Sequence, residues 1–544
     1  MLGSRITGLR NRPLRSGGVR RSATVRKVWN FSTRDSALPR LPRGLPTQRQ
    51  ASLGGAQAPC GDTRAVPKMT RSPRLFARAC VAAGQPKHKW GEAPLVRGLS
   101  VSDTTTTLIL PRWVVPVEPA GEVLERHAVA VRGGRIEAIL PAEAARKRFA
   151  QYPAFALPEH ALIPGFVNAH THAAMTLMRG IADDRALMRW LQEHIWPAEA
   201  KHISPQFVTD GTLLACAEML RGGTTCFNDM YYFPEAALQA ALAANMRACL
   251  GAIVIDFPSA YAADPDDYLR KGLALRDRYA DRPLLSFCLA PHAPYTVSDQ
   301  SFAKVAKLAA ELDLPVHIHV HETADEVSRS ELEHGARPLE RLQRLGLLGP
   351  GFIAVHAVHV SDAEIALLAR HGCSVVHCPS SNLKLASGFA PVAALIGEGV
   401  NLALGTDGAA SNNRLDMFQE MRTAALLAKA VARDAEAMPA QVALRAATLG
   451  GAAALGLESS IGSIVVGKQA DFAAIDLSGP ELKPCYDVTS HLVYAAGREQ
   501  VSHVWVAGRL VMRDRVLQQP VFADLDRRCE MWQSALSSNS DIRP

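Results

Sequence analysis

The run Leu162-Ile-Pro-Gly-Phe-Val-Asn-Ala-His-Thr-His-Ala-Ala-Met175 is a short apolar stretch that leads into two histidines, His170 and His172. In a β-strand, residues i and i+2 project from the same face, so both imidazoles reach one point at the C-terminal end of the strand. Metal sites use this spacing, although unrelated histidines also produce it by chance. The run therefore predicts a strand that carries part of a candidate metal site.

Seven more strand-like apolar runs follow, and helical stretches such as 302–312 and 362–370 separate them. Eight β-α units predict an α/β protein with a (β/α)8 TIM-like barrel over residues 162–455, whose active site lies at the C-terminal ends of the strands. The seven runs are Thr224–Asn228, Arg247–Val254, Leu284–Leu289, Val316–Val320, Phe352–His356, Ser374–His377 and Asn401–Gly405.

Short strand-like runs also flank the barrel on both sides, in residues 103–161 and 456–520. They predict a small β-sandwich that both ends of the chain build together, followed by a C-terminal tail over residues 521–544. The runs are Leu108–Leu110, Trp113–Val115, Ala128–Val131, Arg135–Ile139, Gly462–Val466, Ala470–Ile475, His503–Gly508 and Leu510–Met512.

Charge is distributed unevenly along the 544 residues, whose net charge is +8. The first 100 residues carry 20 Lys and Arg against 3 Asp and Glu, which leaves 40 basic and 49 acidic residues in the rest. We expect residues 1–102 to be a disordered basic extension. Such a segment resembles a transit peptide, but we favour an over-extended gene start with Met69 as an internal start. The mildly acidic remainder gives no reason to expect a nucleic acid partner.

Composition indicates a soluble globular protein, with 48% apolar and 21% charged residues. No apolar run approaches the roughly 18 to 20 residues that span a bilayer, so we expect no membrane partner. The ten cysteines are scattered without a Cys-x-x-Cys pair. They predict free thiols and a cytoplasmic location.

Polar side chains with metal and acid-base chemistry follow the predicted strands at the end where an active site is expected. In His317-Ile-His-Val-His-Glu322 we take His319 as the ligand, because Glu322 comes three residues later and can turn into the cavity. His356 ends the sixth strand and Asp407 follows the eighth. Each alone has a structural explanation, since Thr-Asp-Gly is a common turn. Their joint occurrence at one end favours a site.

Three histidines and one aspartate suit a borderline divalent ion such as Zn²⁺, with one open position for water. The ion lowers the pKa of that water from about 15.7 to about 7. Asp407 can bind the metal and accept the proton, and His356 can stabilise the charge that develops. Glu322 can protonate a ring nitrogen and the leaving group. These roles predict hydrolytic displacement at an sp² carbon.

Longer motifs resemble the amidohydrolase superfamily, in its mononuclear aminohydrolase branch, and within it the methylthioadenosine/S-adenosylhomocysteine deaminase (TRZ/ATZ-type) family. The resemblance covers roughly residues 105–520. The motifs are Pro164-Gly-Phe-Val-Asn-Ala-His-Thr-His172, His172-Ala-Ala-Met-Thr-Leu-Met-Arg-Gly180, Ile195-Trp-Pro-Ala-Glu199, Ala290-Pro-His-Ala-Pro-Tyr295, Pro379-Ser-Ser-Asn-Leu-Lys-Leu385 and Gly405-Thr-Asp-Gly-Ala-Ala-Ser-Asn-Asn413.

The resemblance implies a role for each candidate site residue. The implied metal ligands are His170, His172, His319 and Asp407. The implied substrate contacts are Glu199, His292, Glu322 and Asp407, and the implied catalytic residues are Glu322, His356 and Asp407. Residues alone would favour a solvated carboxylate at Glu199 and a turn histidine at His292. Binuclear members of the superfamily carry a bridging lysine near the fourth strand, and residues 284–295 contain none, so we expect one metal per subunit.

The leading hypothesis is a zinc-dependent deaminase that replaces the 6-amino group of an adenosine thioether by a 6-oxo group. The same site would serve a guanine or cytosine deaminase or a triazine hydrolase, and a non-catalytic binding barrel is the third alternative. Fe²⁺ or Mn²⁺ in place of Zn²⁺, the preferred nucleoside and a homo-oligomeric state stay open. Met175, Met178 and Trp190 are candidates for an apolar wall, and Arg179 and Arg185 for a partner of a carboxylate tail.

Overall fold

The computed structural model describes residues 106–537, so the extension expected over residues 1–102 lies outside the described residues. Within residues 106–537, no helix is both long and apolar enough to cross a membrane.

Eight parallel strands form the barrel, in sequence order from β6 to β13. The strands are β6 (Phe166–Thr171), β7 (Thr224–Asp229), β8 (Arg247–Val254), β9 (Leu285–Pro291), β10 (Val316–Val320), β11 (Phe352–His356), β12 (Ser374–His377) and β13 (Asn401–Leu404). Strands β7 to β13 lie within two residues of their predicted runs. β6 begins at Phe166, four residues after the start of its predicted run, because residues 162–164 belong to β5 (Ala154–Pro164). The predicted (β/α)8 fold is confirmed.

Strand register brings the C-terminal ends of the strands to one rim. In the β10–β11 pair, for example, Val316 lies opposite Phe352 and Val320 lies opposite His356. The barrel closes at this rim where the amide of Asp407, just past β13, donates to the His170 carbonyl of β6 at 3.1 Å. A Cβ at Gly405 would lie 2.8 Å from His170 Cβ, so only glycine allows this approach.

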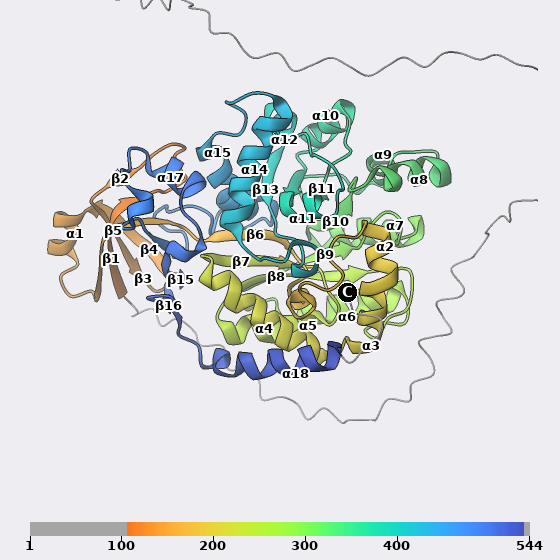
Figure 1. Ribbon diagram of the computed structural model, residues 1–544, viewed down its shortest axis with the longest axis horizontal. Helices are drawn as coiled ribbons and strands as arrows, with labels where there is room; N and C mark the ends of the chain where they lie inside the picture. Colours follow the sequence, from red (N-terminus) through yellow and green to blue (C-terminus); the bar gives the residue numbers. More distant parts are fainter. Residues whose placement is uncertain (1–105, 538–544) are drawn as a thin grey trace, which may run out of the picture. The chain divides into compact units, whose positions relative to one another are not determined.

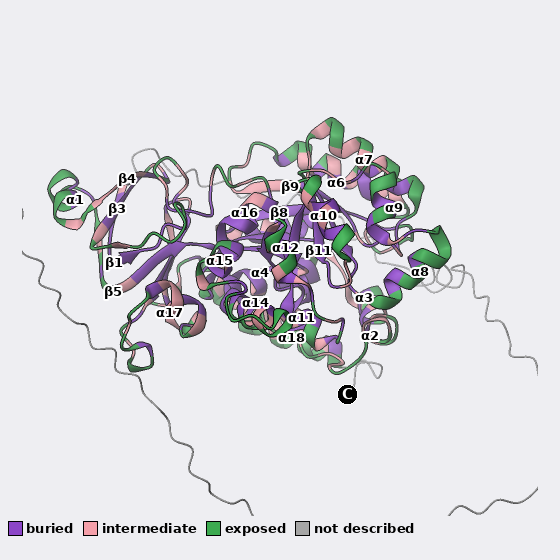
Figure 2. Ribbon diagram, turned by 90° about the horizontal axis from the view of Figure 1, so that it is seen from above, coloured by how far each residue is buried: buried purple, intermediate pink, exposed green. Residues whose placement is uncertain are grey.

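Helices alternate with the strands and cover the barrel, and Figure 2 shows buried strands inside the exposed outer faces of helices such as α7 and α8. Capping residues in the local sequence fix where several of these helices begin. Ser361 and Glu364 form a capping box at the start of α10, which satisfies amides that the first turn leaves unpaired. The principal covering helices are α4 (Pro205–Arg221), α5 (Pro234–Ala244), α6 (Pro265–Tyr279), α7 (Asp299–Leu312), α8 (Ala324–His334), α9 (Pro338–Arg344), α10 (Asp362–Arg370), α11 (Pro379–Lys384), α12 (Val392–Gly397), α14 (Met417–Ala432) and α15 (Ala440–Arg445).

The two flanking segments, orange and blue in Figure 1, meet in one nine-stranded sheet. β5 joins the halves because it pairs with β1 on one side and with β14 on the other. The β3–β4 hairpin then packs onto β14 and β15 in one apolar cluster, so the sandwich arises from a sheet that curls over itself. The strands are β1 (Thr106–Val114), β2 (Leu124–Glu125), β3 (His127–Arg132), β4 (Arg135–Pro141), β5 (Ala154–Pro164), β14 (Phe472–Asp476), β15 (Val501–Val506), β16 (Arg509–Arg513) and β17 (Val516–Leu517).

Two local predictions for this sheet differ from the structure. Leu108–Leu110 and Trp113–Val115 were predicted as separate strands, but both runs lie in or directly beside one strand, β1. The pairing of β1 with β5 shifts its register between Pro111 and Trp113, and the strand continues past this irregularity. Gly462–Val466 is not a strand. Ile464 is buried and its amide donates to the Pro116 carbonyl at 2.9 Å, so this segment contributes its apolar side chain without a ladder of its own.

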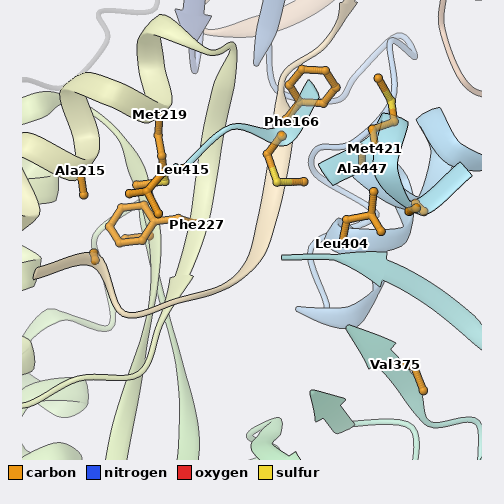
Figure 3. Close-up of a cluster of buried hydrophobic side chains, with 14 of the residues drawn as sticks. Phe166, Ala215, Met219, Phe227, Val375, Leu404, Leu415, Met421 and Ala447 are labelled. Carbon is orange, nitrogen blue, oxygen red and sulfur yellow. The ribbon is translucent and has the colours of Figure 1, made fainter. Parts of the chain in front are cut away.

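Side chains from the strands and the covering helices share a large core (Figure 3), in which Phe227 of β7, Met219 of α4 and Leu415 lie in one group. A buried ion pair also connects the barrel with the curled sheet, because Arg247 of β8 donates to Asp471 beside β14 at 3.0 Å. The described residues after Leu517 end in α18 (Leu525–Ser537), whose Trp532 indole donates to Asp210 of α4 at 2.9 Å.

Candidate active site

Four predicted ligands gather at the rim of the barrel. One side-chain donor atom from each of His170, His172, His319 and Asp407 lies within 4.8 Å of the other three. The Asp407 carboxylate oxygen Oδ1 lies 3.2 Å from Nε2 of both His170 and His172. His319 Nε2 lies 3.2 Å from His170 Nε2. Three nitrogens and one oxygen that converge in this way fit a divalent ion such as Zn²⁺.

The far nitrogen of each imidazole has its own hydrogen-bond partner, which fixes the orientation of the ring. His172 Nδ1 donates to the Met230 carbonyl at 2.6 Å, and His319 Nδ1 donates to the His292 carbonyl at 2.8 Å. A carbonyl only accepts, so in both rings Nδ1 carries a proton and Nε2 faces the centre of the site. A metal ion would take the place of any proton on Nε2. This arrangement fits metal binding.

Asp407 follows β13 in a left-handed conformation with φ of 60°. Its Oδ2 accepts from Ser381 Oγ at 2.6 Å and from Ser411 Oγ at 2.9 Å. Burial alone would raise its pKa, but the hydrogen bonds and charges of His170 and His172 outweigh burial and hold the pKa of Asp407 well below its usual range. The carboxylate is therefore ionised at neutral pH.

Glu322 and His356 lie side by side next to this set, with Glu322 Oε2 3.8 Å from His356 Nε2. Burial raises the pKa of the Glu322 carboxyl, which favours a proton carrier near neutral pH. Its Oε1 accepts from Ser387 Oγ at 3.2 Å. His356 Nδ1 donates to Asn382 Oδ1 at 2.8 Å, so its Nε2 is directed toward the cavity.

A pocket that is open to solvent lies over these residues; the space between its atoms, including part of the bulk solvent at its mouth, is about 740 Å³. His292 and Glu199 line it as well. Burial lowers the pKa of His292 to about 3, with help from the neighbouring His172 and His170, so its ring is neutral. Glu199 comes from α3 (Trp196–His202) and is 9% exposed, not the solvated carboxylate that its residue type suggested.

The Glu199 carboxylate has one strong partner, the Tyr231 hydroxyl, which donates to Oε1 at 2.8 Å. Burial raises the pKa of Glu199 to about 7, although the Tyr231 hydrogen bond opposes this shift. A carboxylate in this environment gains a favourable interaction when a ligand hydroxyl donates to it.

The rest of the pocket wall is largely apolar. Of the three predicted wall residues, Met175 and Trp190 line the pocket, whereas Met178 is buried outside its lining. Arg179 points elsewhere, because it donates to the Asn413 carbonyl and pairs with Glu218 at 2.5 Å. The other apolar residues of this wall include Leu187, Leu191, Ile195, Trp196 and Phe257.

Several residues that contact the candidate site had no role in the sequence analysis, namely Ser381, Asn382, Ser411, Ser387 and Tyr231. The first two lie in the motif Pro379–Leu385 and the third lies in Gly405–Asn413. The family motifs include these three residues, but the sequence did not predict which side chains they contact.

Comparison with known proteins agrees with this geometry. Residues 161–511 match the amidohydrolase family. A 5-methylthioadenosine/S-adenosylhomocysteine deaminase of Saccharophagus degradans is 48% identical over 426 residues, which cover 78% of this chain and 96% of that protein. The protein of the same name from Teredinibacter turnerae is 47% identical over 426 residues, which again cover 78% of this chain and 96% of that protein.

Solved structures share the fold. An adenosine deaminase from Xanthomonas campestris with bound zinc superposes with a TM-score of 0.79 at 55% identity, over 80% of this chain and 99% of that one. The guanine deaminase of E. coli shares the fold at 23% identity, with a TM-score of 0.69 over 75% of this chain and 99% of its own.

Proposed function

Because this chain belongs to the amidohydrolase family, we propose that it is a zinc-dependent deaminase of adenosine thioethers. It would convert the 6-amino group of 5′-methylthioadenosine, S-adenosylhomocysteine or adenosine to a 6-oxo group and release ammonia. The observation that carries the proposal is a single pocket whose lining includes three members of the four-residue donor set, His172, His319 and Asp407, together with Glu322 and Glu199. The curated relatives named for this activity support it.

We assign His170, His172, His319 and Asp407 to hold one metal ion per subunit. When bound, the ion supplies the Lewis acidity that makes hydroxide available at neutral pH. Zn²⁺ is our choice because the donor set is mostly nitrogen and the Xanthomonas campestris structure contains zinc. Fe²⁺ and Mn²⁺ accept similar donors and are the alternatives for a metal analysis.

The protein's own groups move the protons. Asp407, which is ionised, accepts a proton from the attacking water. His356, oriented by Asn382, directs Nε2 toward the attacking oxygen; with a proton on both ring nitrogens it donates from Nε2 to that oxygen and stabilises the charge that develops there. Glu322 protonates a purine ring nitrogen as the tetrahedral centre forms. The proton that Asp407 took from water then passes to the departing amino group, which leaves as ammonia, and the proton of the new hydroxyl returns to Glu322 as the 6-oxo group forms. The net reaction consumes one water for each ammonia released.

Glu199 and His292 would hold the nucleoside. The buried Glu199 carboxylate can accept hydrogen bonds from ribose hydroxyls, and neutral His292, which lines the same pocket, can bond to the sugar or base. A ribose requirement separates this proposal from the alternatives with a free base or a triazine, which would use the same metal site without needing Glu199.

The pocket also bears on the 5′ substituent. Among the described residues that line it, none is lysine or arginine, and the wall near Trp190 and Phe257 is apolar. A methylthio group matches such a wall, whereas the carboxylate of a homocysteine tail would lack a cationic partner there. We therefore expect kcat/KM to be about tenfold or more higher for methylthioadenosine than for S-adenosylhomocysteine, because tenfold corresponds to only about 1.4 kcal/mol.

The test is to purify the protein, measure its metal content, and follow ammonia release and ultraviolet absorbance with methylthioadenosine, S-adenosylhomocysteine, adenosine, adenine and guanine. Turnover of the nucleosides with adenine inert would support the proposal. Turnover of a free base alone would favour the alternative deaminase, and no turnover by the zinc-loaded protein would favour a binding barrel. We expect a small-molecule partner only; a homo-oligomer and a cytoplasmic location stay predictions.

A further inference from the structure

We propose that His317 is a positioning residue that keeps His170 in the one tautomer able to bind metal. The inference rests on the proposed metal-dependent function and adds a residue that lies outside the donor set. His317 is on β10, two positions before His319, and its side chain is fully buried.

The two nitrogens of the His170 ring face in opposite directions. Nε2 faces the site, 3.2 Å from Asp407 Oδ1 and 3.2 Å from His319 Nε2. Nδ1 faces away from it and lies 3.0 Å from His317 Nε2. His317 therefore contacts the ligand histidine from behind, on the side away from the metal.

This hydrogen bond has two directions, and only one is compatible with a metal. If His170 Nδ1–H donates to His317 Nε2, the His170 Nε2 lone pair is free for the ion. If His317 donates instead, the proton of His170 sits on Nε2 and blocks coordination. A metal-loaded site therefore needs His317 as the acceptor, with its own proton on Nδ1.

His170 differs in this respect from the other two histidines of the donor set. Backbone carbonyls, which only accept, fix His172 and His319. His170 relies on a side chain, so a substitution can remove its acceptor without altering the backbone.

Burial makes a purely structural role for His317 a poor explanation. Among the described residues, Nδ1 of His317 has no hydrogen-bond partner although it is buried. A half-satisfied buried imidazole does not favour folding, and an apolar side chain of similar size would fill the same space without an unpaired polar atom. The hydrogen bond to His170 therefore explains why a histidine occupies this position.

The experiment compares His317→Leu, which removes the acceptor, with His317→Gln, whose amide oxygen reaches about as far as the lost Nε2. Zinc dissociation constants of the full-length proteins are measured by chelator competition, and urea unfolding of the metal-free proteins is measured alongside. We expect His317→Leu to weaken zinc binding about 10- to 100-fold. His317→Gln should stay within about threefold of the wild type, and metal-free His317→Leu should unfold at the wild-type urea concentration or above it.

Wild-type zinc affinity in His317→Leu would overturn the inference. An equal loss of zinc affinity in His317→Leu and His317→Gln would overturn it as well, because the loss would then come from altered packing and not from the missing acceptor. If His317→Leu does not fold, His317→Asn takes its place, because its shorter side chain withdraws the acceptor from His170; wild-type affinity in that variant would refute the inference as well. A wild-type protein that binds no divalent ion would instead refute the proposed function.

Discussion

Replacing Glu199 by glutamine tests whether this pocket recognises a ribose. Glu199 is 9% exposed and accepts from the Tyr231 hydroxyl at 2.8 Å. Glutamine keeps the size and can still accept that hydrogen bond, but it removes the negative charge. The substitution therefore isolates the contribution of the charge to binding of the sugar.

The size of the effect follows from the kind of hydrogen bond. A bond from a ribose hydroxyl to a buried carboxylate contributes about 1.5 to 3 kcal/mol. Since about 1.4 kcal/mol is a factor of ten, kcat/KM for methylthioadenosine should fall by about 10- to 100-fold in Glu199→Gln.

The assay compares each protein on the nucleoside and on its 2′-deoxy and 3′-deoxy analogues. If Glu199 accepts from one of these hydroxyls, the substitution should have little further effect on the analogue that lacks it. Glu193→Gln is the matched control, because Glu193 lies in the preceding turn, is exposed and pairs with Arg189 at 2.8 Å. It should leave kcat/KM unchanged.

Stability gives a second, independent readout at this position. The pKa of Glu199 rises from its usual 4.5 to about 7, so the unfolded chain ionises first as the pH increases. The contribution of Glu199 to the free energy of unfolding of the wild type therefore falls between pH 4.5 and pH 7, by roughly 3 kcal/mol in all. Glutamine does not titrate, so Glu199→Gln should gain on the wild type by that amount between pH 4 and pH 8 in urea unfolding.

Two results would refute the ribose assignment. One is an unchanged kcat/KM for the nucleoside in Glu199→Gln. The other is an equal loss on the nucleoside and on both deoxy analogues, since the carboxylate would then act on something other than these hydroxyls.

Three further substitutions test other parts of the molecule. Glu322→Gln should lower kcat about 100- to 10,000-fold while zinc content is retained, because it removes the proton carrier; full activity in a steady-state assay would exclude that role. Asn382→Leu should lower kcat about tenfold with little change in KM, because His356 loses the 2.8 Å bond that orients it, and a change in KM alone would contradict this. Asp471→Ala leaves Arg247 buried without its charge partner and should reduce the free energy of unfolding by about 3 to 5 kcal/mol. Adding Arg247→Met should restore part of the lost stability. A loss below about 1 kcal/mol for Asp471→Ala in urea unfolding would contradict this prediction.

The distance along the chain over which an interaction acts explains which strands were predictable. β10, β11 and β12 have the predicted bounds because apolar runs and the turns beside them are local features. β5 was missed because its two prolines argue against a strand. The structure tolerates Pro158 because β14 pairs only with residues 160–164, beyond that position.

The sequence by itself determined the barrel and the candidate ligands, since both depend on spacing within a few residues: alternation along a strand aims His170 and His172 at one point, and strand ends carry Asp407 and His356 to one rim. Only the tertiary structure decided which groups orient them. Asn382 reaches His356 from 26 residues away, and His317 reaches His170 from 147 residues away. Such contacts depend on how strands and helices pack across the barrel, and no local pattern records that packing.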